Sequence, residues 1–513
     1  MRRAIPCLAK KRTGGVMTVP VVPSFEERVK AIEDDWATNP RWEFTTRHYK
    51  PIDVVRLQGS LPPLDSYSKQ QSDKAWRMFT KMREDKDCAV TFGALDPVQI
   101  VQMSKYARAI YVSGWQCSST HTTTNEVGPD LADYPMNSVP DKVDGLVKAL
   151  RFHDKKQWQA NPGEAGPVDY NPPIIADADT GHGGLTAVAK LTKLFIDAGA
   201  AGGHFEDQRP GSKKCGHMGG KVLVSMQEHC DRLMAVRLQA DILGSSFLAV
   251  ARTDAEAGSL IDNNGDARDH EFIKGVAANG KCDTFIEIVA ATLDKADAQK
   301  WREATVLKGK SLAEMKDLAK TFTKGSVPEF DWEACRTRDG FFQYSACVNA
   351  CIARGKAFAP YADLCWMETA KPGIAQAKAF SDALKPTGKF LAYNLSPSFN
   401  WDAAGMTDAQ ISSFCQDLAN MGYVFQFITL AGFHGSGLIA DQLASKLIPD
   451  KDMLAYVKMI QRVEREKGIE LLTHQKWAGA GYIDAQLSTI RGGADDIGIN
   501  AAGNTEDQFG KKK

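Results

Sequence analysis

The stretch PPIIADAD (172–179) shows the pattern from which the fold is predicted. It is a short run of strand-forming apolar residues that ends in carboxylates at Asp177 and Asp179. Because alternate residues of a strand share a face, these two carboxylates lie on one side of the chain. Seven other stretches follow a similar plan: CAVTFGAL (88–95), AIYVSGW (109–115), AGGHFED (201–207), FLAVARTD (247–254), ADLCWMET (362–369), FLAYNLSP (390–397) and FQFITLAG (425–432). The sequence therefore predicts eight strands.

Segments with helical periodicity separate most of these strands. In 225–243, an apolar stripe with the spacing of one helix face is formed by Met226, Cys230, Leu233 and Met234. Strands that alternate with helices indicate right-handed βαβ crossovers and a parallel sheet. Eight such units predict a closed (β/α)8 barrel of the TIM type. No Gly-x-Gly-x-x-Gly follows the first strand, which argues against a dinucleotide-binding sheet.

The rest of the chain is expected to form additions to this barrel. Residues 1–24 are a basic tail, which we interpret as a targeting segment or a disordered end. We assign 25–275 to the first part of the barrel domain and 336–450 to its remainder. About a hundred residues separate the fifth and sixth strands, so we interpret 276–335 as a helical insertion on the barrel rim. Residues 451–513 are expected to form a C-terminal helical extension.

Composition narrows the class of protein. The 513 residues carry 63 Lys and Arg against 63 Asp and Glu, which gives no electrostatic case for nucleic acid or an anionic membrane as partner. No apolar run approaches the ~20 residues of a transmembrane helix. Eleven cysteines without a Cys-x-x-Cys pair indicate reduced, intracellular thiols. We expect a cytoplasmic or mitochondrial location; for a glyoxysome or peroxisome the usual C-terminal tripeptide is missing.

Four acidic residues at predicted strand ends or loops indicate a metal site: Asp130, Asp177, Asp179 and Glu206. Barrels of this class build their active sites at the carboxyl ends of the strands, so these side chains are expected to converge. Four carboxylates repel one another unless a cation lies among them, and oxygen ligands suit Mg²⁺, with Mn²⁺ as a substitute. Taken singly, each acid could instead cap a helix or pair with a lysine.

Other strand ends carry groups that could bind a carboxylate. Arg252 offers a planar bidentate donor, although a structural pair with an aspartate is an equal alternative. Uncharged donors recur at Asn394, Ser396 and Ser398, with Thr429 on the next strand, unless the proline among them only makes a turn. Ser113 and Gly114 end the second strand, and Glu368 ends the sixth. We expect three histidines to be structural: His182, His204 and His434.

The loop KKCGHMGGK (213–221) combines lysines, a thiol and an imidazole with several glycines. The lysines and histidine favour the thiolate, so we expect Cys215 to exchange a proton near neutral pH. The glycines are typical of a mobile loop that closes on a ligand. The alternative is a basic surface loop with an incidental cysteine.

Together these motifs resemble the isocitrate lyase family. The stretches that carry the resemblance, in family order, are SGWQ (113–116), ADADTGHGG (176–184), KKCGHM (213–218), ARTD (251–254), WMET (366–369), NLSPSFNW (394–401) and QFITLAG (426–432). The resemblance extends from about residue 25 to the end, and the insertion resembles that of eukaryotic members. A hydrolase or mutase on the same barrel would share the acids but lack the loop. A non-enzymatic scaffold would have lost some of the charged strand ends.

The resemblance implies a Mg²⁺-dependent carbon–carbon lyase of the glyoxylate cycle that cleaves isocitrate into glyoxylate and succinate. The alternative is a 2-methylisocitrate lyase, which gives pyruvate and succinate. Bulk at Trp115, Phe399 and Trp401 would leave little room for the additional methyl group. The family assembles as a homotetramer that exchanges C-terminal helices between subunits, which implies the same partner arrangement here.

The resemblance also implies a role for each matching residue. Asp177 would contact the metal directly, and Asp130, Asp179 and Glu206 would hold its waters. Contacts to the glyoxylate half would come from Ser113, Gly114, Trp115 and Arg252. Contacts to the succinate half would come from Gly216, His217, Asn394, Ser396, Ser398 and Thr429. The catalytic set would be Cys215 as the acid, Tyr111 as a candidate base, and Lys213, His217 and Glu368.

Overall fold

The computed structural model describes residues 22–120, 126–493, 498–499 and 505–510. Its centre is one eight-stranded sheet. The strands are β1 (Ala89–Phe92), β2 (Ile110–Val112), β3 (Ile174–Asp177), β4 (Gly202–Glu206), β6 (Leu248–Thr253), β11 (Leu364–Met367), β12 (Phe390–Asn394) and β13 (Tyr423–Ile428). They pair in parallel in the order β1-β13-β12-β11-β6-β4-β3-β2, and a parallel bridge between Gly93 and Tyr111 brings the ends of the sheet together. The predicted barrel is confirmed.

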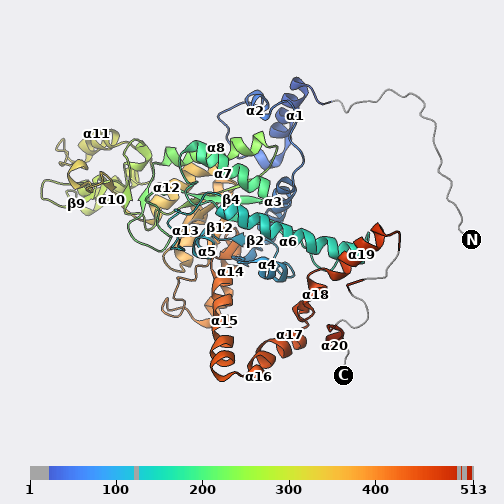
Figure 1. The fold of residues 1–513 in the computed structure, drawn as a ribbon. Coiled ribbons are helices and arrows are strands. Elements are labelled where there is room, and N and C mark those ends of the chain that lie inside the picture. The colour runs from blue at the N-terminus through green and yellow to red at the C-terminus, as the bar shows by residue number, and fades with distance from the viewer. Residues whose placement is uncertain (1–21, 121–125, 494–497, 500–504, 511–513) are drawn as a thin grey trace, which may run out of the picture.

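Helices surround the barrel (Figure 1). They are α1 (Phe25–Thr38), α2 (Pro51–Gln58), α3 (Tyr67–Asp85), α4 (Pro97–Met103), α5 (Gly114–Thr120), α6 (Ser138–Ala160), α7 (Leu185–Ala198), α8 (Met226–Ile242), α12 (Val348–Phe358), α13 (Ile374–Leu384) and α14 (Asp408–Asn420). The predicted stripe of α8 faces inward, since Met226, Cys230 and Leu233 are buried. Side-chain caps fix several helix starts, as where Ser225 accepts the backbone N–H of Glu228.

A separate lobe lies between the fifth and sixth barrel strands. It contains α9 (Phe285–Ala290), α10 (Lys295–Thr305) and α11 (Leu312–Phe322), which pack around a core of their own with Trp301 fully buried (Figure 1). The sequence did not predict its hairpin, β8 (Lys274–Val276) with β9 (Cys282–Thr284). It also did not predict a small sheet of β5 (Val222–Leu223), β7 (Leu260–Ile261) and β10 (Phe342–Gln343). The expected limits of the insertion, 276–335, stay a prediction.

The chain beyond the barrel forms an arm of helices. They are α15 (Ala431–Asp450), α16 (Met453–Tyr456), α17 (Arg462–Lys467), α18 (His474–Trp477), α19 (Ala480–Ile490) and α20 (Asp507–Gly510). The arm leads away from the barrel and returns to α6, where the rings of Tyr482 and Phe152 meet at 5.6 Å (Figure 1). No helix within the described ranges is long and apolar enough to cross a bilayer. Most of the basic tail lies outside those ranges.

The amino end of the barrel is closed by α3 and by a group of buried charges. Phe79 of α3 packs on Phe390 and Phe425 of the barrel, with ring centroids 6.0 and 5.9 Å apart. Nearby, Asp363 binds Arg237, and Arg41 lies 3.5 Å from the same carboxylate. Both arginines share this acid, and Asp73 lies 3.9 Å from Arg41 Nη1, so a further cation in this group finds its acids already paired.

Lys389 is that further cation. Its Nζ has only a 3.5 Å contact to Thr45 Oγ1 in the described part of the chain. Burial lowers the pKa of Lys389 from 10.5 to about 8; Asp363 opposes this shift and Arg237 adds to it. The native protein therefore holds its lysine charge less readily than the unfolded chain does.

We predict that Lys389→Met stabilises the protein at pH 7. A fall in pKa of this size corresponds to a penalty of roughly 3 kcal/mol while the lysine is charged. The unfolded chain binds more protons between pH 8 and 10.5, so stability of the wild type rises with pH in that window and the advantage of the variant disappears. Urea unfolding at pH 7 and pH 10 measures both values. A destabilised variant at pH 7 would contradict the prediction.

Candidate active site

A cavity of about 300 Å³ opens at the carboxyl end of the barrel strands. Fourteen of the residues predicted from sequence line it: Tyr111, Ser113, Trp115, Asp130, Asp177, Cys215, Gly216, His217, Arg252, Glu368, Asn394, Ser396, Ser398 and Thr429. The other predicted residues, Gly114, Asp179, Lys213 and Glu206, are buried behind this surface. Strands far apart in the sequence therefore supply one site.

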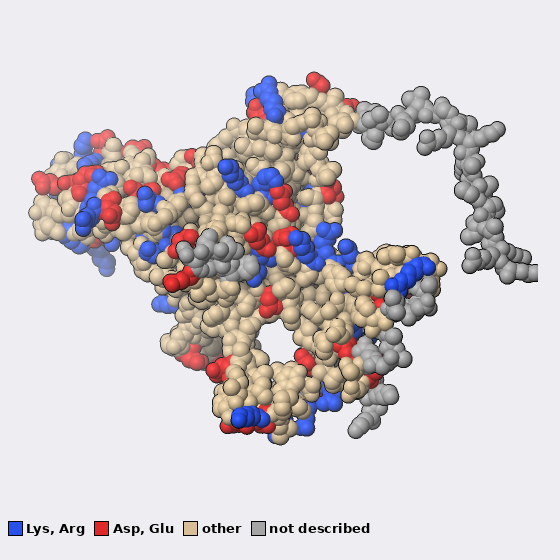
Figure 2. Space-filling model, viewed as in Figure 1, with Lys and Arg blue, Asp and Glu red and all other residues tan. Residues whose placement is uncertain are grey.

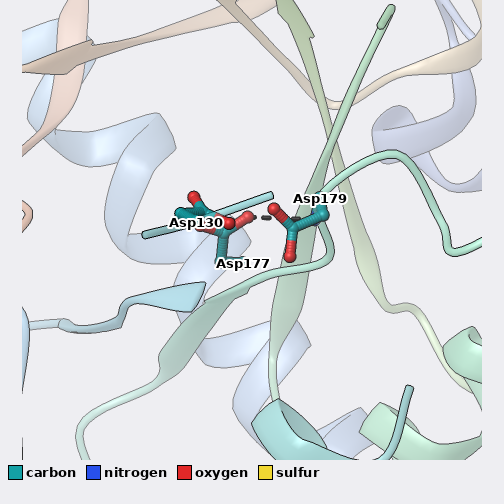
Figure 3. A group of neighbouring side chains, drawn as sticks. All are labelled: Asp130, Asp177 and Asp179. Atoms are coloured by element: carbon teal, nitrogen blue, oxygen red, sulfur yellow. Dashed lines mark hydrogen bonds between the residues drawn. The ribbon is translucent and has the colours of Figure 1, made fainter. Parts of the chain in front are cut away.

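Three aspartates form the acidic side of the cavity. Asp177 ends β3, Asp179 follows it, and Asp130 comes from the connection between α5 and α6. Their carboxylates face one another, each offering an oxygen within 4.8 Å of the others (Figure 3). Glu206, expected as a fourth metal acid, is not in this group: its Oε2 lies 3.0 Å from Arg252 Nη1.

The ammonium of Lys213 lies against this acidic group. Its Nζ is 2.6 Å from Asp130 Oδ2 and 2.6 Å from Asp179 Oδ1. Burial alone would lower the pKa of Lys213, but the two carboxylates raise it well above its usual value. Lys213 is therefore a charged partner of the acids.

The acidic group fits a hard divalent cation. Burial, and then the charge of Asp179, raise the pKa of Asp130 to about 8, so a cation beside this carboxyl group would favour its ionised form. Asp130 Oδ1 is buried and has no hydrogen-bond donor in the described part of the chain. Oxygen ligands only, with one left unsatisfied, are the donor set that Mg²⁺ or Mn²⁺ prefers.

Tyr111 lies beside Asp177 at the floor of the cavity. Its hydroxyl is 3.0 Å from His204 Nε2 and 3.4 Å from Asp177 Oδ2. Burial, followed by Asp177, raises the pKa of Tyr111 well above 10, so its resting form is a phenol. Burial also lowers the pKa of His204 to about 4, so the imidazole is neutral. Tyr111 can therefore act as a base only after its hydroxyl has lost its own proton.

The backbone at Gly114 approaches Asp177 closely. The N–H of Gly114 donates to Asp177 Oδ2 at 3.1 Å. A Cβ at this position would lie 2.9 Å from the same oxygen and 2.8 Å from the hydroxyl of Tyr134. A side chain at residue 114 would therefore displace a candidate metal ligand.

Arg252 forms the basic side of the cavity. Its guanidinium packs on Trp366, 4.6 Å from the ring centroid, and pairs with Asp254 through Nε at 3.0 Å and Nη2 at 3.1 Å. The structural aspartate pair considered from sequence is thus present, and Arg252 still faces the cavity. Glu368 lies 3.6 Å from Arg252 Nη2 and accepts a hydrogen bond from Asn394 Nδ2 at 3.2 Å.

The glycine-rich loop covers Arg252. A Cβ on Gly216 would be 2.8 Å from Arg252 Nη2, so only glycine allows this approach. His217 next to it is 3.2 Å from the carbonyl oxygen of Thr369 through Nε2 and 3.5 Å from Ser396 Oγ through Nδ1. The loop therefore contacts the donors at the end of β12 that were predicted from the sequence, through His217 and Ser396.

The expectation of an activated Cys215 thiolate was wrong. Burial, and then the charge of Asp130, raise the pKa of the Cys215 thiol. Lys213 lowers it less, because its ammonium is bound between Asp130 and Asp179. Cys215 is therefore a protonated thiol at neutral pH, which is the form that a proton donor needs.

Several residues of the site were not predicted. Tyr134 donates a hydrogen bond to Asp179, and no local pattern marks it in the sequence. Phe433 and His434, in the first turn of α15, line the cavity, as do Leu430 and Pro397. Phe433 and His434 directly follow the last strand motif, which was a usable signal in a barrel. Of the histidines expected to be structural, His434 lines the cavity, whereas His204 is buried behind it in contact with Tyr111.

We predict that Asp177→Asn raises the Kd for Mg²⁺ more than Asp179→Asn does, because Asp177 borders the cavity and Asp179 is held by Lys213 and Tyr134. A residue that acts only by orienting ligands costs about 10–100-fold in metal affinity, and we expect this range for Asp179→Asn. Isothermal titration measures both, with the exposed neighbour Asp133→Asn as the control. Equal affinity in Asp177→Asn and the wild type would contradict the assignment.

Comparison with known proteins identifies the family of this chain. A model described as the isocitrate lyase family matches residues 28–299 and 283–509. The isocitrate lyase of Oryza sativa subsp. japonica is 45% identical, with 94% of this chain and 93% of that protein aligned. That of Kluyveromyces lactis is 44% identical over 94% and 97%, and the mitochondrial 2-methylisocitrate lyase of Hypocrea atroviridis is 42% identical over 94% and 94%. The chain belongs to the isocitrate lyase family.

Proposed function

We propose that this protein is a carbon–carbon lyase that cleaves isocitrate into glyoxylate and succinate with Mg²⁺. The observation that carries the proposal is the cavity in which Asp130 and Asp177 of the acidic group, Arg252, the donors at the end of β12 and the Cys215 loop meet. A cation held by the acids, a guanidinium and hydroxyl donors suit a substrate with several carboxylates. The membership of the isocitrate lyase family supports the same reaction.

The cleavage is a retro-aldol step, in which the C2 hydroxyl loses a proton as the C2–C3 bond breaks. Asp177, with Asp130 and Asp179, would hold the cation, which stabilises negative charge on the oxygens of the glyoxylate half when it is bound. Tyr111 is our candidate for the base. Its hydroxyl lies 3.0 Å from His204 Nε2, which orients it, and it can accept the substrate proton only after losing its own.

The succinate half leaves as a carbanion that must be protonated. Cys215 is our candidate for the acid, because its raised pKa keeps the proton on the sulfur at neutral pH. Once the proton has left, the nearby charges of Lys213 and Arg252 favour the thiolate. Asn394, Ser396, Ser398, Thr429 and the loop residues Gly216 and His217 would hold the succinate carboxylates.

2-Methylisocitrate is the second candidate substrate, since a relative of that name is 42% identical to this chain. The additional methyl group lies on the hydroxyl-bearing carbon, because cleavage gives pyruvate in place of glyoxylate and the same succinate. Of the three residues expected to limit space there, only Trp115 lines the cavity. Phe399 instead packs on the rings of His217 and Trp401. Phe433 supplies the second aromatic wall, in edge contact with Trp115 at 5.2 Å, so we favour isocitrate.

We predict a higher kcat/KM for isocitrate than for 2-methylisocitrate, by about 10–200-fold, the range that one methyl-sized group allows. Glyoxylate and pyruvate release from the two substrates, with and without Mg²⁺, measures this ratio. A tenfold preference for 2-methylisocitrate would contradict the substrate assignment.

We predict that Cys215→Ser binds both products normally and loses almost all turnover, because a hydroxyl is a far weaker acid than a thiol. An active Cys215→Ser variant would contradict the assignment of Cys215 as the acid.

We also propose a homotetramer in which the helical arm packs on neighbouring subunits. Of the 20 residues of α15, only Gly432 is buried. Leu438 is 57% and Ile448 is 69% exposed, and Figure 2 shows an opening between the arm and the barrel. Apolar side chains exposed along a whole helix are typical of a protein interface.

We predict that Leu438→Asp with Ile448→Asp lowers the mass in solution from a tetramer to smaller species, because two charges would enter the apolar contact. Light scattering after size exclusion measures the mass. The control is Gln442→Asp, which adds a charge to the same exposed helix. A wild-type protein that remains monomeric at micromolar concentration would contradict the assembly. The cytoplasmic or mitochondrial location expected from the sequence also stays a prediction.

A further inference from the structure

The loop KKCGHMGGK (213–221) is held at both ends by buried lysines. Lys213 and Lys221 are each 1% exposed, whereas the residues between them are half-buried or exposed. Lys213 binds Asp130 and Asp179, and Lys221 Nζ lies 2.7 Å from Asp254 Oδ1. A lysine is almost never fully buried without a partner, so each ion pair fixes the chain at that end. The loop is thus attached to the acidic group at one end and to Asp254 at the other.

Asp254 is also the residue that orients Arg252. It accepts Nε and Nη2 of Arg252 on its two oxygens, and its Oδ1 serves Arg252 and Lys221 together. Glu206 and Glu368 approach the same guanidinium, at 3.0 and 3.6 Å. A ligand carboxylate must compete with these acids for Arg252. The ammonium of Lys221 reduces that competition, because it neutralises Asp254 from the other side.

We propose that Lys221 is a positioning residue for carboxylate binding. It holds Asp254, leaves the positive charge of Arg252 available to the ligand, and fixes the end of the loop that covers Arg252 at Gly216. Lys221 is not among the residues that line the cavity, so it acts through Asp254. The inference rests on the proposed function, because the carboxylate is that of the glyoxylate half.

The test compares Lys221→Met, Lys221→Arg and the control Lys214→Met. The methionine keeps the length of the side chain and removes its charge, and Arg252 still pairs with Asp254 in its absence. Lys214 changes the charge of the same loop equally, but its side chain has no ion pair in the described part of the chain. If Lys221→Met does not fold, Lys221→Gln replaces it.

We expect Lys221→Met to weaken glyoxylate binding about tenfold or more, a typical coupling for a lost buried charge pair. Its Kd for Mg²⁺ should stay near the wild-type value, and KM for isocitrate should rise more than kcat falls. Peptide mapping should show faster alkylation of Cys215 by iodoacetamide in the free protein, because the loop has lost one attachment. Lys221→Arg should restore most of the glyoxylate affinity, and Lys214→Met should keep it.

The results separate a failure of this inference from a failure of the proposed function. Wild-type glyoxylate affinity and alkylation rate in Lys221→Met would overturn the inference. An equal loss in Lys214→Met would also overturn it, since loop charge alone would then explain the effect. If the wild type does not cleave isocitrate, the proposed function fails. The alkylation comparison would still decide whether Lys221 holds the loop.

Discussion

The ion pair network of Arg354 is the contact on which the carboxyl end of the barrel depends. From α12, its Nη1 lies 3.0 Å from Asp207 Oδ2 and its Nη2 lies 2.7 Å from Asp269 Oδ1, with all three side chains fully buried. Asp207 also accepts the backbone N–H of Asp254, and Asp269 accepts that of Met226 at the start of α8. Removing one partner of such a network leaves an uncompensated buried charge and costs about 3–5 kcal/mol.

This network also fixes the chain segments on both sides of the Cys215 loop. Asp207 follows β4, and its backbone oxygen accepts the N–H of Val224, so the chain that carries the Cys215 loop leaves and returns at one point. The hydroxyl of Thr253 donates to Asp207 as well, which fixes the end of β6 next to Arg252. Backbone and side-chain contacts of Asp207 thus position the strand ends beside the cavity, and the middle of the loop, 218–220, is exposed. Preorganised charge of this kind is the usual source of electrostatic catalysis.

The sequence predicted the barrel and most cavity residues because both follow from local pattern. Each of the eight apolar runs is one strand, and the polar residue after a run must point into the carboxyl end of a parallel barrel. The charge balance around Cys215, in contrast, depends on residues that are far apart in the sequence. Nothing in the order Lys213, Lys214, Cys215 shows that the first lysine turns away to bind Asp130 and Asp179, so the pKa of Cys215 was predicted in the wrong direction. Tyr134 was missed for the same reason, whereas the hairpin β8–β9 was missed although Asn279-Gly280 in its turn is a local signal.

The start of α15 joins the cavity to the arm. Phe433 and His434 line the cavity from the first turn of this helix, and the N–H of Phe433 donates to Gln116 Oε1 at 3.1 Å. Gln99 from α4 holds the same turn through Gly432 O and Ser436 Oγ, at 3.0 and 2.6 Å. Beyond this turn α15 has no buried residue. A helix fixed only at the cavity transmits any tilt imposed on its far end to Phe433, the side chain that faces Trp115. In the proposed tetramer, the contact with a neighbouring subunit would be made by the same helix that carries Phe433 into the pocket next to Trp115.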